Sequence, residues 1–175
     1  KCCAKIIGQI IHFCSKDCMD IRTIGERVAQ DLVLFGMIND ISNLYCLKNS
    51  YTPEKLAEAL GEGYGTKSCQ KMFDAIENSK NKPFANVLAG LSIPGVGKVV
   101  GRLLANKFKN IDNLLNADYI DLVNIEGIGD IMAIDIINWV NDDNNRDICL
   151  YLKANGLKMS VDDAETKTIV EDRGI

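Results

Sequence analysis

The sequence predicts an all-α fold, and three observations carry that prediction. Apolar residues recur at three- and four-residue steps, a short glycine-containing triplet repeats at equal intervals, and no stretch longer than a few residues alternates as a strand would. The chain has 175 residues, 47% hydrophobic and 25% charged, which is enough for one domain with a core. This composition excludes a disordered tail, a collagen-like fibre and a small disulfide scaffold.

Helices in the first half are indicated by periodicity and by start signals. Residues 6–19 place their apolar side chains on one side of a helix. Thr52 and Pro53 are typical of an N-cap followed by the first helical residue. A helix is therefore expected from Pro53 onward, with its apolar side chains on one face.

Two further helices are predicted near the C-terminal end. Asp118 is typical of an N-cap for a helix over residues 119–125. Residues 131–140 form another amphipathic pattern, and the polar run 141–145 is expected to end that helix.

An internal repeat defines how these helices are organised. The triplets Gly63-Tyr64-Gly65, Gly95-Val96-Gly97 and Gly127-Ile128-Gly129 begin 32 residues apart, and Thr23-Ile24-Gly25 is a degenerate fourth copy. Each follows a short helical segment and precedes another helical pattern. The sequence therefore predicts four tandem helix-hairpin-helix motifs packed as one compact helical domain.

Such a turn has a physical use beyond closing two helices. A glycine can adopt positive φ, the middle apolar residue packs between the helices, and the second helix presents its free N–H groups outward. Those amides and the helix dipole suit a DNA phosphate, which they bind without reading sequence. For any single copy, a turn that only closes a helical hairpin remains the alternative.

Charge is distributed unevenly around these hairpins. The net charge of −4 and pI near 5.0 argue at first against a nucleic-acid partner, yet residues 48–109 carry +5 and residues 110–161 carry −6. Lys67 and Lys71 follow the second hairpin, and Lys98 and Arg102 follow the third, so these two are predicted as the main phosphate clamps. The fourth, beside Asp130, is expected to act through its amides alone or to pack. The predicted DNA-binding residues are Gly25, Arg27, Gly63, Gly65, Lys67, Gly95, Val96, Gly97, Lys98, Arg102, Gly127 and Gly129.

No catalytic centre is visible in the sequence. It contains no K-x-D-G, no G-x-G-x-x-G and no phosphate-binding loop motif, and its one histidine, His12, is expected to pack or cap. The catalytic residues are therefore predicted to be none. Cys2, Cys3, Cys14 and Cys18 could be offered as a zinc site, but the adjacent pair lacks the usual C-x₂-C reach and the other two suit a packed helix face.

Several motifs in order resemble those of bacterial NAD-dependent DNA ligases, in the part that follows their zinc finger. Residues 2–5, CCAK, look like the end of a four-cysteine finger, and residues 11–21, IHFCSKDCMDI, look like the family's H-F-x-S-R-x-x-M-x-I stretch. The strings GYGTKS at 63–68, AIENSK at 75–80 and LSIPGVG at 91–97 are similar to its G-F-G-x-K-S, I-E-x-S-K and L-G-I-x-x-V-G. The match covers about residues 2–140.

The resemblance implies a division of the chain and a role for it. Residues 1–5 would be the zinc-finger remnant, 6–158 a helix-hairpin-helix DNA-binding domain, and 159–175 an acidic linker toward a C-terminal domain. Cys2 would be the last of four zinc ligands, the other three lying upstream. This chain departs from the family's pattern at three positions. Cys3 stands where the family has proline, Lys16 where it has arginine, and Thr23 where its first hairpin has glycine.

By the same resemblance, the parent enzyme seals nicks in DNA replication and repair and uses NAD, Mg and Zn, with no cofactor in this fragment. The expected partners are nicked double-stranded DNA and other domains of the same ligase chain, with no membrane. A chain that begins at Lys1 is interpreted as part of a longer protein. Its seven irregularly spaced cysteines favour a reducing bacterial cytoplasm. Two alternatives remain: the hairpin portion of an excision-repair nuclease subunit, and a protein-docking helical module.

Overall fold

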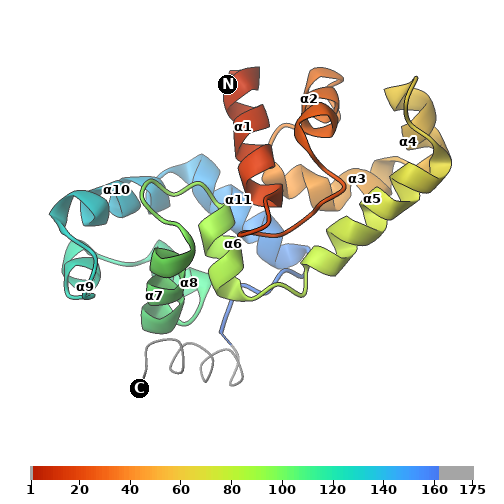
Figure 1. The fold of residues 1–175 in the computed structure, drawn as a ribbon. Coiled ribbons are helices and arrows are strands. Elements are labelled where there is room, and N and C mark those ends of the chain that lie inside the picture. Colours follow the sequence, from red (N-terminus) through yellow and green to blue (C-terminus); the bar gives the residue numbers. More distant parts are fainter. Residues whose placement is uncertain (1, 162–175) are drawn as a thin grey trace.

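The computed structural model describes residues 2–161 and is built of helices (Figure 1). In chain order the elements are α1 (Cys3–Cys14), α2 (Glu26–Leu34), the 3₁₀ helix η1 (Ile41–Cys46), α3 (Leu47–Ser50), α4 (Pro53–Leu60), α5 (Thr66–Ser79), α6 (Phe84–Gly90), α7 (Lys98–Phe108), α8 (Ile111–Leu115), α9 (Tyr119–Val123), α10 (Asp130–Val140) and α11 (Asp143–Ala154). Within residues 2–161 the only β feature is an isolated bridge between Asn110 and Ser160. The all-α prediction is confirmed.

Among the consecutive helices that contact one another are four pairs: α1 with α2, α4 with α5, α6 with α7, and α9 with α10. Each pair brackets one of the four triplets found in the sequence. Figure 1 shows α4 and α9 toward opposite ends of the molecule, with α1 and α6 between them. The triplets are thus distributed along an elongated helical body.

The predicted start signals act as N-caps. The Thr52 side chain accepts a hydrogen bond from the Lys55 amide at 3.2 Å, and Pro53 is the first residue of α4. Asp118 accepts from the Asp121 amide at 2.9 Å at the start of α9. Both caps satisfy an amide that the helix itself leaves unpaired.

The first helix is shorter than its apolar pattern predicts. It ends at Cys14 rather than Met19, because Ser15 is extended and its hydroxyl donates to the His12 carbonyl at 2.6 Å. The chain then folds back, and the Met19 amide donates to the Phe13 carbonyl at 3.0 Å. Met19 and Cys18 are buried, so the apolar pattern was real but belongs to a packed loop.

The polar run 141–145 ends α10 at Val140, as predicted, and its last residues also begin the next helix. Only Asn141 and Asp142 lie between α10 and α11, and the Asp142 side chain accepts from the Asn145 amide at 3.0 Å. The run is therefore the capped first turn of a helix. Arg146 on this helix donates to the Leu115 carbonyl at 2.7 Å and the Val140 carbonyl at 3.0 Å, tying α11 to the ends of α8 and α10.

The core is centred where η1 meets α1 and α5. Phe13 and Tyr45 pack edge to face with ring centroids 6.2 Å apart, and the Tyr45 hydroxyl is 2.7 Å from the Ser79 hydroxyl in a buried hydrogen bond. His12 Nε2 lies 2.7 Å from the Ala89 carbonyl oxygen, as a packing or capping histidine would. Asn86 donates to the Cys18 carbonyl at 2.8 Å. These two contacts hold the first helix pair against α6.

The end of the described chain packs on the α7–α8 connection. The Ile111 amide donates to the Met159 carbonyl at 2.9 Å, and the Val161 amide donates to the Lys109 carbonyl at 2.7 Å. Met159 is buried. The folded part therefore runs through the first three residues of the expected linker, and residues 162–175 of that linker lie outside the described residues.

Candidate nucleic-acid interface

The first glycine of each full triplet is demanded by the backbone. Gly63, Gly95 and Gly127 have φ of +92°, +77° and +100°, in the left-handed region that other residues rarely adopt. The residue between the glycines faces inward: Val96 and Ile128 are buried, and Tyr64 is half-buried against the core. This part of the turn is explained by folding alone.

The last residue of each triplet is a glycine (the second glycine of the three full triplets), and neither its backbone conformation nor its surroundings require a glycine there. Gly25, Gly65, Gly97 and Gly129 are the N-caps of α2, α5, α7 and α10 and have extended φ and ψ that any residue adopts. A Cβ added at any of the four would meet nothing within 4 Å. The surface over these glycines is open, so a side chain there would obstruct only something that approaches from outside.

The amides at these four helix starts have no side-chain cap. The i→i−4 ladder begins with Ala29, Cys69, Gly101 and Ala133, each donating to the second glycine of its triplet. The three amides before each of those residues lie outside the ladder. In contrast, η1, α4, α8, α9 and α11 begin on an Asp, Asn or Thr that accepts from a backbone amide. The second helices of the four pairs thus present free donors with positive dipole character.

Hairpin 1 (residues 23–25) packs against hairpin 2 (residues 63–65). Arg27, in the first turn of α2, stacks on the Tyr64 ring at 5.5 Å and donates to the Glu62 carbonyl at 3.3 Å. The Tyr64 hydroxyl donates to Asp31 at 2.6 Å. Burial, together with this hydrogen bond, raises the pKa of Tyr64 to about 12.

Hairpin 3 (residues 95–97) and hairpin 4 (residues 127–129) are packed reciprocally. A Cβ at Gly95 would lie 3.5 Å from the Met132 side chain on α10, and a Cβ at Gly127 would lie 3.3 Å from the Leu103 side chain on α7. Each hairpin therefore sits on the second helix of the other. The four hairpins form two double-hairpin units, 1 with 2 and 3 with 4.

The charges beside the free amides differ between hairpins. Lys67 and Lys98 are exposed in the first turns of α5 and α7, where no acidic residue stands. The first turns of α2 and α10 instead carry Glu26 and Asp130, which oppose the binding of an anion. Asp130 also accepts a hydrogen bond from the Tyr119 hydroxyl. That hairpins 2 and 3 are the more favourable phosphate sites stays a prediction.

Two of the predicted contact residues, Arg27 and Arg102, have surroundings that the sequence did not indicate, whereas Val96 is packed as expected. Arg27 is engaged with hairpin 2, so it shapes that turn as well as carrying charge. Val96 is buried in the core beneath its own turn. Arg102 is half-buried on α7. Sequence reasoning also passed over Val99 and Ile131, which follow the glycines by two residues and are 69% and 79% exposed. Their helical spacing had suggested packing.

The cysteines do not come together. Cys2 and Cys3 are exposed, whereas Cys14 and Cys18 are buried at the other end of α1. Burial raises the pKa of Cys14 to about 12, unlike that of a thiolate ligand. Among the described residues no group of three or more His, Cys, Asp or Glu side chains could hold a metal ion. The donors present do not fit a complete zinc site, and Cys2 could supply one ligand of four at most.

No helix in residues 2–161 combines the length and the apolar character that a membrane span requires.

Comparison with known proteins gives the same motif and a consistent set of relatives. Residues 86–149, which include hairpins 3 and 4, match the family model described as "Helix-hairpin-helix motif". A protein named DNA ligase from Natranaerobius thermophilus is 36% identical over 95% of this chain and 24% of its own length. DNA ligases from Fusobacterium nucleatum and Rubrobacter xylanophilus are 33% and 37% identical over 94% and 90% of the chain, or 23% and 22% of theirs.

The chain spans about a quarter of the length of these curated relatives. The family model covers the third and fourth hairpins, and the assignment of the first two to the same motif stays a prediction. Along nearly all of its length the chain is similar to proteins named DNA ligase, and its residues 86–149 match the helix-hairpin-helix motif.

Proposed function

We propose that this chain is a sequence-independent duplex-DNA-binding domain that holds the phosphate backbone on both sides of the minor groove. The observation that carries the proposal is the second glycine of each triplet. Four helices start on a glycine whose conformation and surroundings do not require it, and each start presents uncapped amides. A phosphate that accepts hydrogen bonds from those amides needs the space that a side chain would fill.

The acidic average of the chain does not oppose this function. Amides and helix dipoles attract phosphate without adding formal charge. Lys67 and Lys98 add side-chain cations at hairpins 2 and 3. Because hairpins pair within each unit, two helix starts can face one duplex at neighbouring phosphates. We infer that hairpins 2 and 3 contribute most of the binding energy and that Asp130 weakens hairpin 4.

The parent protein, on this proposal, is an NAD-dependent ligase that seals nicks in replication and repair in the bacterial cytoplasm. The names of the relatives and the ordered motifs support it. In that family a lysine upstream of this region is adenylated from NAD, and Mg assists the reaction. On this proposal the present chain binds the DNA and supplies no catalytic residue. Cys2 would give one ligand to a zinc finger completed by upstream residues. The further partners would be the other domains of the same ligase chain.

Direct binding tests the DNA-binding part of the proposal. Fluorescence anisotropy of the 175-residue chain with labelled nicked duplexes of unrelated sequence should give equal affinities and a linear log–log dependence on salt, with a slope of about 0.9 per neutralised phosphate. The double variant Lys67→Glu/Lys98→Glu should lose binding. Lys55→Glu/Lys158→Glu, which makes the same charge change at exposed lysines outside the hairpins, should retain it apart from the general effect of net charge. No binding at low salt, or equal losses in both variants, would contradict the proposal.

A further inference from the structure

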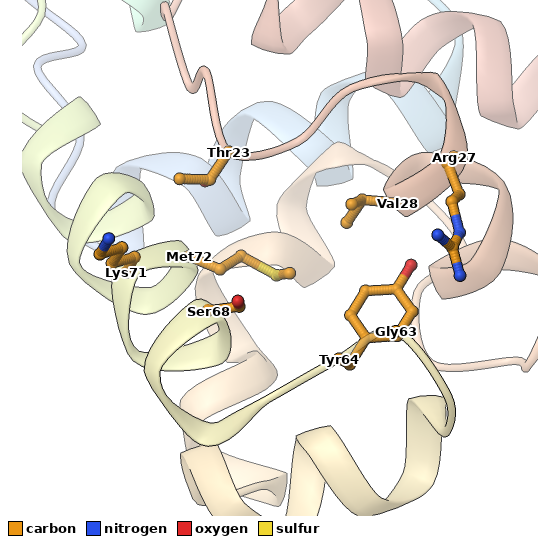
Figure 2. A pocket seen from close by; sticks show the side chains of 8 residues that line it. All are labelled: Thr23, Arg27, Val28, Gly63, Tyr64, Ser68, Lys71 and Met72. Carbon is orange, nitrogen blue, oxygen red and sulfur yellow. The ribbon is translucent and has the colours of Figure 1, made fainter.

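A groove runs along α5 beside the loop that joins α1 to α2. It consists of two hollows that share Thr23. One, of about 300 Å³, lies between Arg27, Tyr64 and the start of α5 (Figure 2). The other, of about 570 Å³, continues past Arg22 to Lys82 at the far end of α5. We call this combined feature the α5 groove.

One face of α5 forms a wall of the groove along most of the helix. Ser68, Lys71, Met72, Ala75, Asn78 and Ser79 line the two hollows and follow one another at helical spacing. From Ser68 to Ser79 the helix rises about 16 Å at 1.5 Å per residue. A stacked nucleic-acid strand advances about 3.4 Å per phosphate, so about five steps fit along this wall. The opposite wall is the loop from Met19 to Thr23.

Basic side chains outnumber acidic ones in the lining of the groove. Of the charged side chains in the described lining, four are basic and one is acidic: Arg22, Arg27, Lys71, Lys82 and Asp20. The hydrogen bond from Arg22, at 3.0 Å, holds the pKa of Asp20 below its usual range, and Lys82 and Lys16 contribute to the same shift. The acid on α5 closest to this end, Glu77, is paired with Lys48 and Lys80 and does not line the groove.

Thr23 provides an observation independent of charge. Its hydroxyl oxygen is buried and has no hydrogen-bond partner within residues 2–161. Figure 2 shows the side chain across the first hollow from Met72 and Ser68. A buried hydroxyl without a partner is unfavourable by about 1–3 kcal/mol, and because the oxygen is closed to solvent a bound group would reach it only when the loop around Thr23 opens.

We propose that the α5 groove binds one unpaired DNA strand that leaves the duplex at a nick, with its phosphates on Arg22, Lys71 and Lys82. The inference rests on the proposed duplex-binding function, because the strand would continue from the phosphate held at the start of α5. Hollows of a few hundred cubic ångströms between a loop and a helix accept a single strand, whereas a duplex is too wide to enter. The acceptor oxygens of a phosphodiester also match the hydroxyl of Ser68, which is exposed in the first hollow.

The test compares a nicked duplex with the same duplex carrying a short single-stranded oligothymidine flap. In the 175-residue chain the flap should increase affinity several-fold. The double variant Arg22→Gln/Lys82→Gln should lose that increment and keep its affinity for the unflapped duplex within about twofold. Asn78→Trp, which fills the groove at an exposed position without changing charge, should do the same. The matched control Lys55→Gln/Lys158→Gln should keep the increment.

A second readout is the salt dependence of binding to oligothymidine alone. Each phosphate contact to a single strand contributes a slope of about 0.7, so neutralising two groove cations should lower the slope by about 1.4. The proposal is overturned if the flap adds no affinity, if the groove and control variants lose the same amount, or if the slope does not change. Failure of the duplex-binding proposal is distinct, because it would be seen as absent binding to the unflapped nicked duplex. Circular dichroism confirms that each variant is folded.

Discussion

Substituting alanine for each glycine of hairpin 3 separates folding from DNA binding. At Gly97 the backbone is extended and a Cβ meets nothing within 4 Å, so Gly97→Ala should change the free energy of unfolding by less than about 1 kcal/mol. At Gly95, φ is +77°, and an alanine there is strained by about 1–2 kcal/mol. For a domain of this length, that strain lowers the melting temperature by about 2–8 °C.

The expected effects on DNA affinity are the reverse. The methyl group at position 97 would stand in front of the α7 amides and keep a phosphate from reaching them. A hydrogen bond to a charged group contributes about 1.5–3 kcal/mol, so affinity for nicked duplex should fall roughly tenfold to a hundredfold. Gly95→Ala, measured below its melting temperature, should bind within about threefold of the unmodified chain, because its methyl group faces Met132 on α10.

Thermal unfolding by circular dichroism and anisotropy titration at low salt measure the two quantities on the same samples. The reasoning is refuted if Gly97→Ala binds DNA normally, or if it loses as much stability as Gly95→Ala does. Gly129→Ala makes a useful comparison, because its Cβ is equally open but Asp130 already weakens that site. A smaller loss of affinity is expected there.

Three further measurements probe charge, packing and pH. Lys98→Gln should reduce the log–log salt slope for duplex binding by about 0.9, measured by anisotropy across a salt series, if this lysine neutralises one phosphate. Gly101→Ala should destabilise the fold by about 1–3 kcal/mol in urea denaturation, because its Cβ would lie 2.8 Å from the Ala85 carbonyl where α6 crosses α7. The phenol of Tyr64 has a pKa of about 12 in the folded protein, so its contribution to stability is complete below pH 10 and is lost as the pH rises through 12. Tyr64→Phe should remove this component of the alkaline destabilisation.

Local signals were sufficient to predict the start of several helices and the form of the turns. Thr52 and Asp118 cap because a short polar side chain before a helix has an amide within reach, which is a property of neighbouring residues. The positive φ of Gly63, Gly95 and Gly127 likewise follows from the turn itself. These features require no knowledge of distant parts of the chain.

Features that depend on distant contacts were not predictable in the same way. Residues up to Met19 keep a helical apolar pattern, but α1 ends at Cys14, and the later residues of the pattern are buried in the loop that follows. The polar run that begins at Asn141 resembles a loop, yet it caps α11, whose Arg146 reaches carbonyls on two other segments.

The candidate site shows the same division. The glycines and lysines of hairpins 2 and 3 could be identified from the repeat and its neighbouring charges. The pairing of hairpins into two units could not, because it depends on Arg27 reaching Glu62 and on Met132 reaching Gly95. The α5 groove is formed by two segments about 50 residues apart in sequence, and the motifs that they carry do not show that the segments lie side by side.

The reciprocal packing of hairpins 3 and 4 also bears on how the domain opens. Gly95 packs on Met132 of α10, and Gly127 packs on Leu103 of α7. When one of the two helix pairs unfolds, the other therefore loses the side chain against which its hairpin packs. The two pairs should behave as a single cooperative unit in native-state hydrogen exchange, with the amides of α7 and α10 losing protection together. A destabilising change in the acidic fourth hairpin would then also unfold the third hairpin, which we propose as a phosphate site, although no residue of that turn had changed.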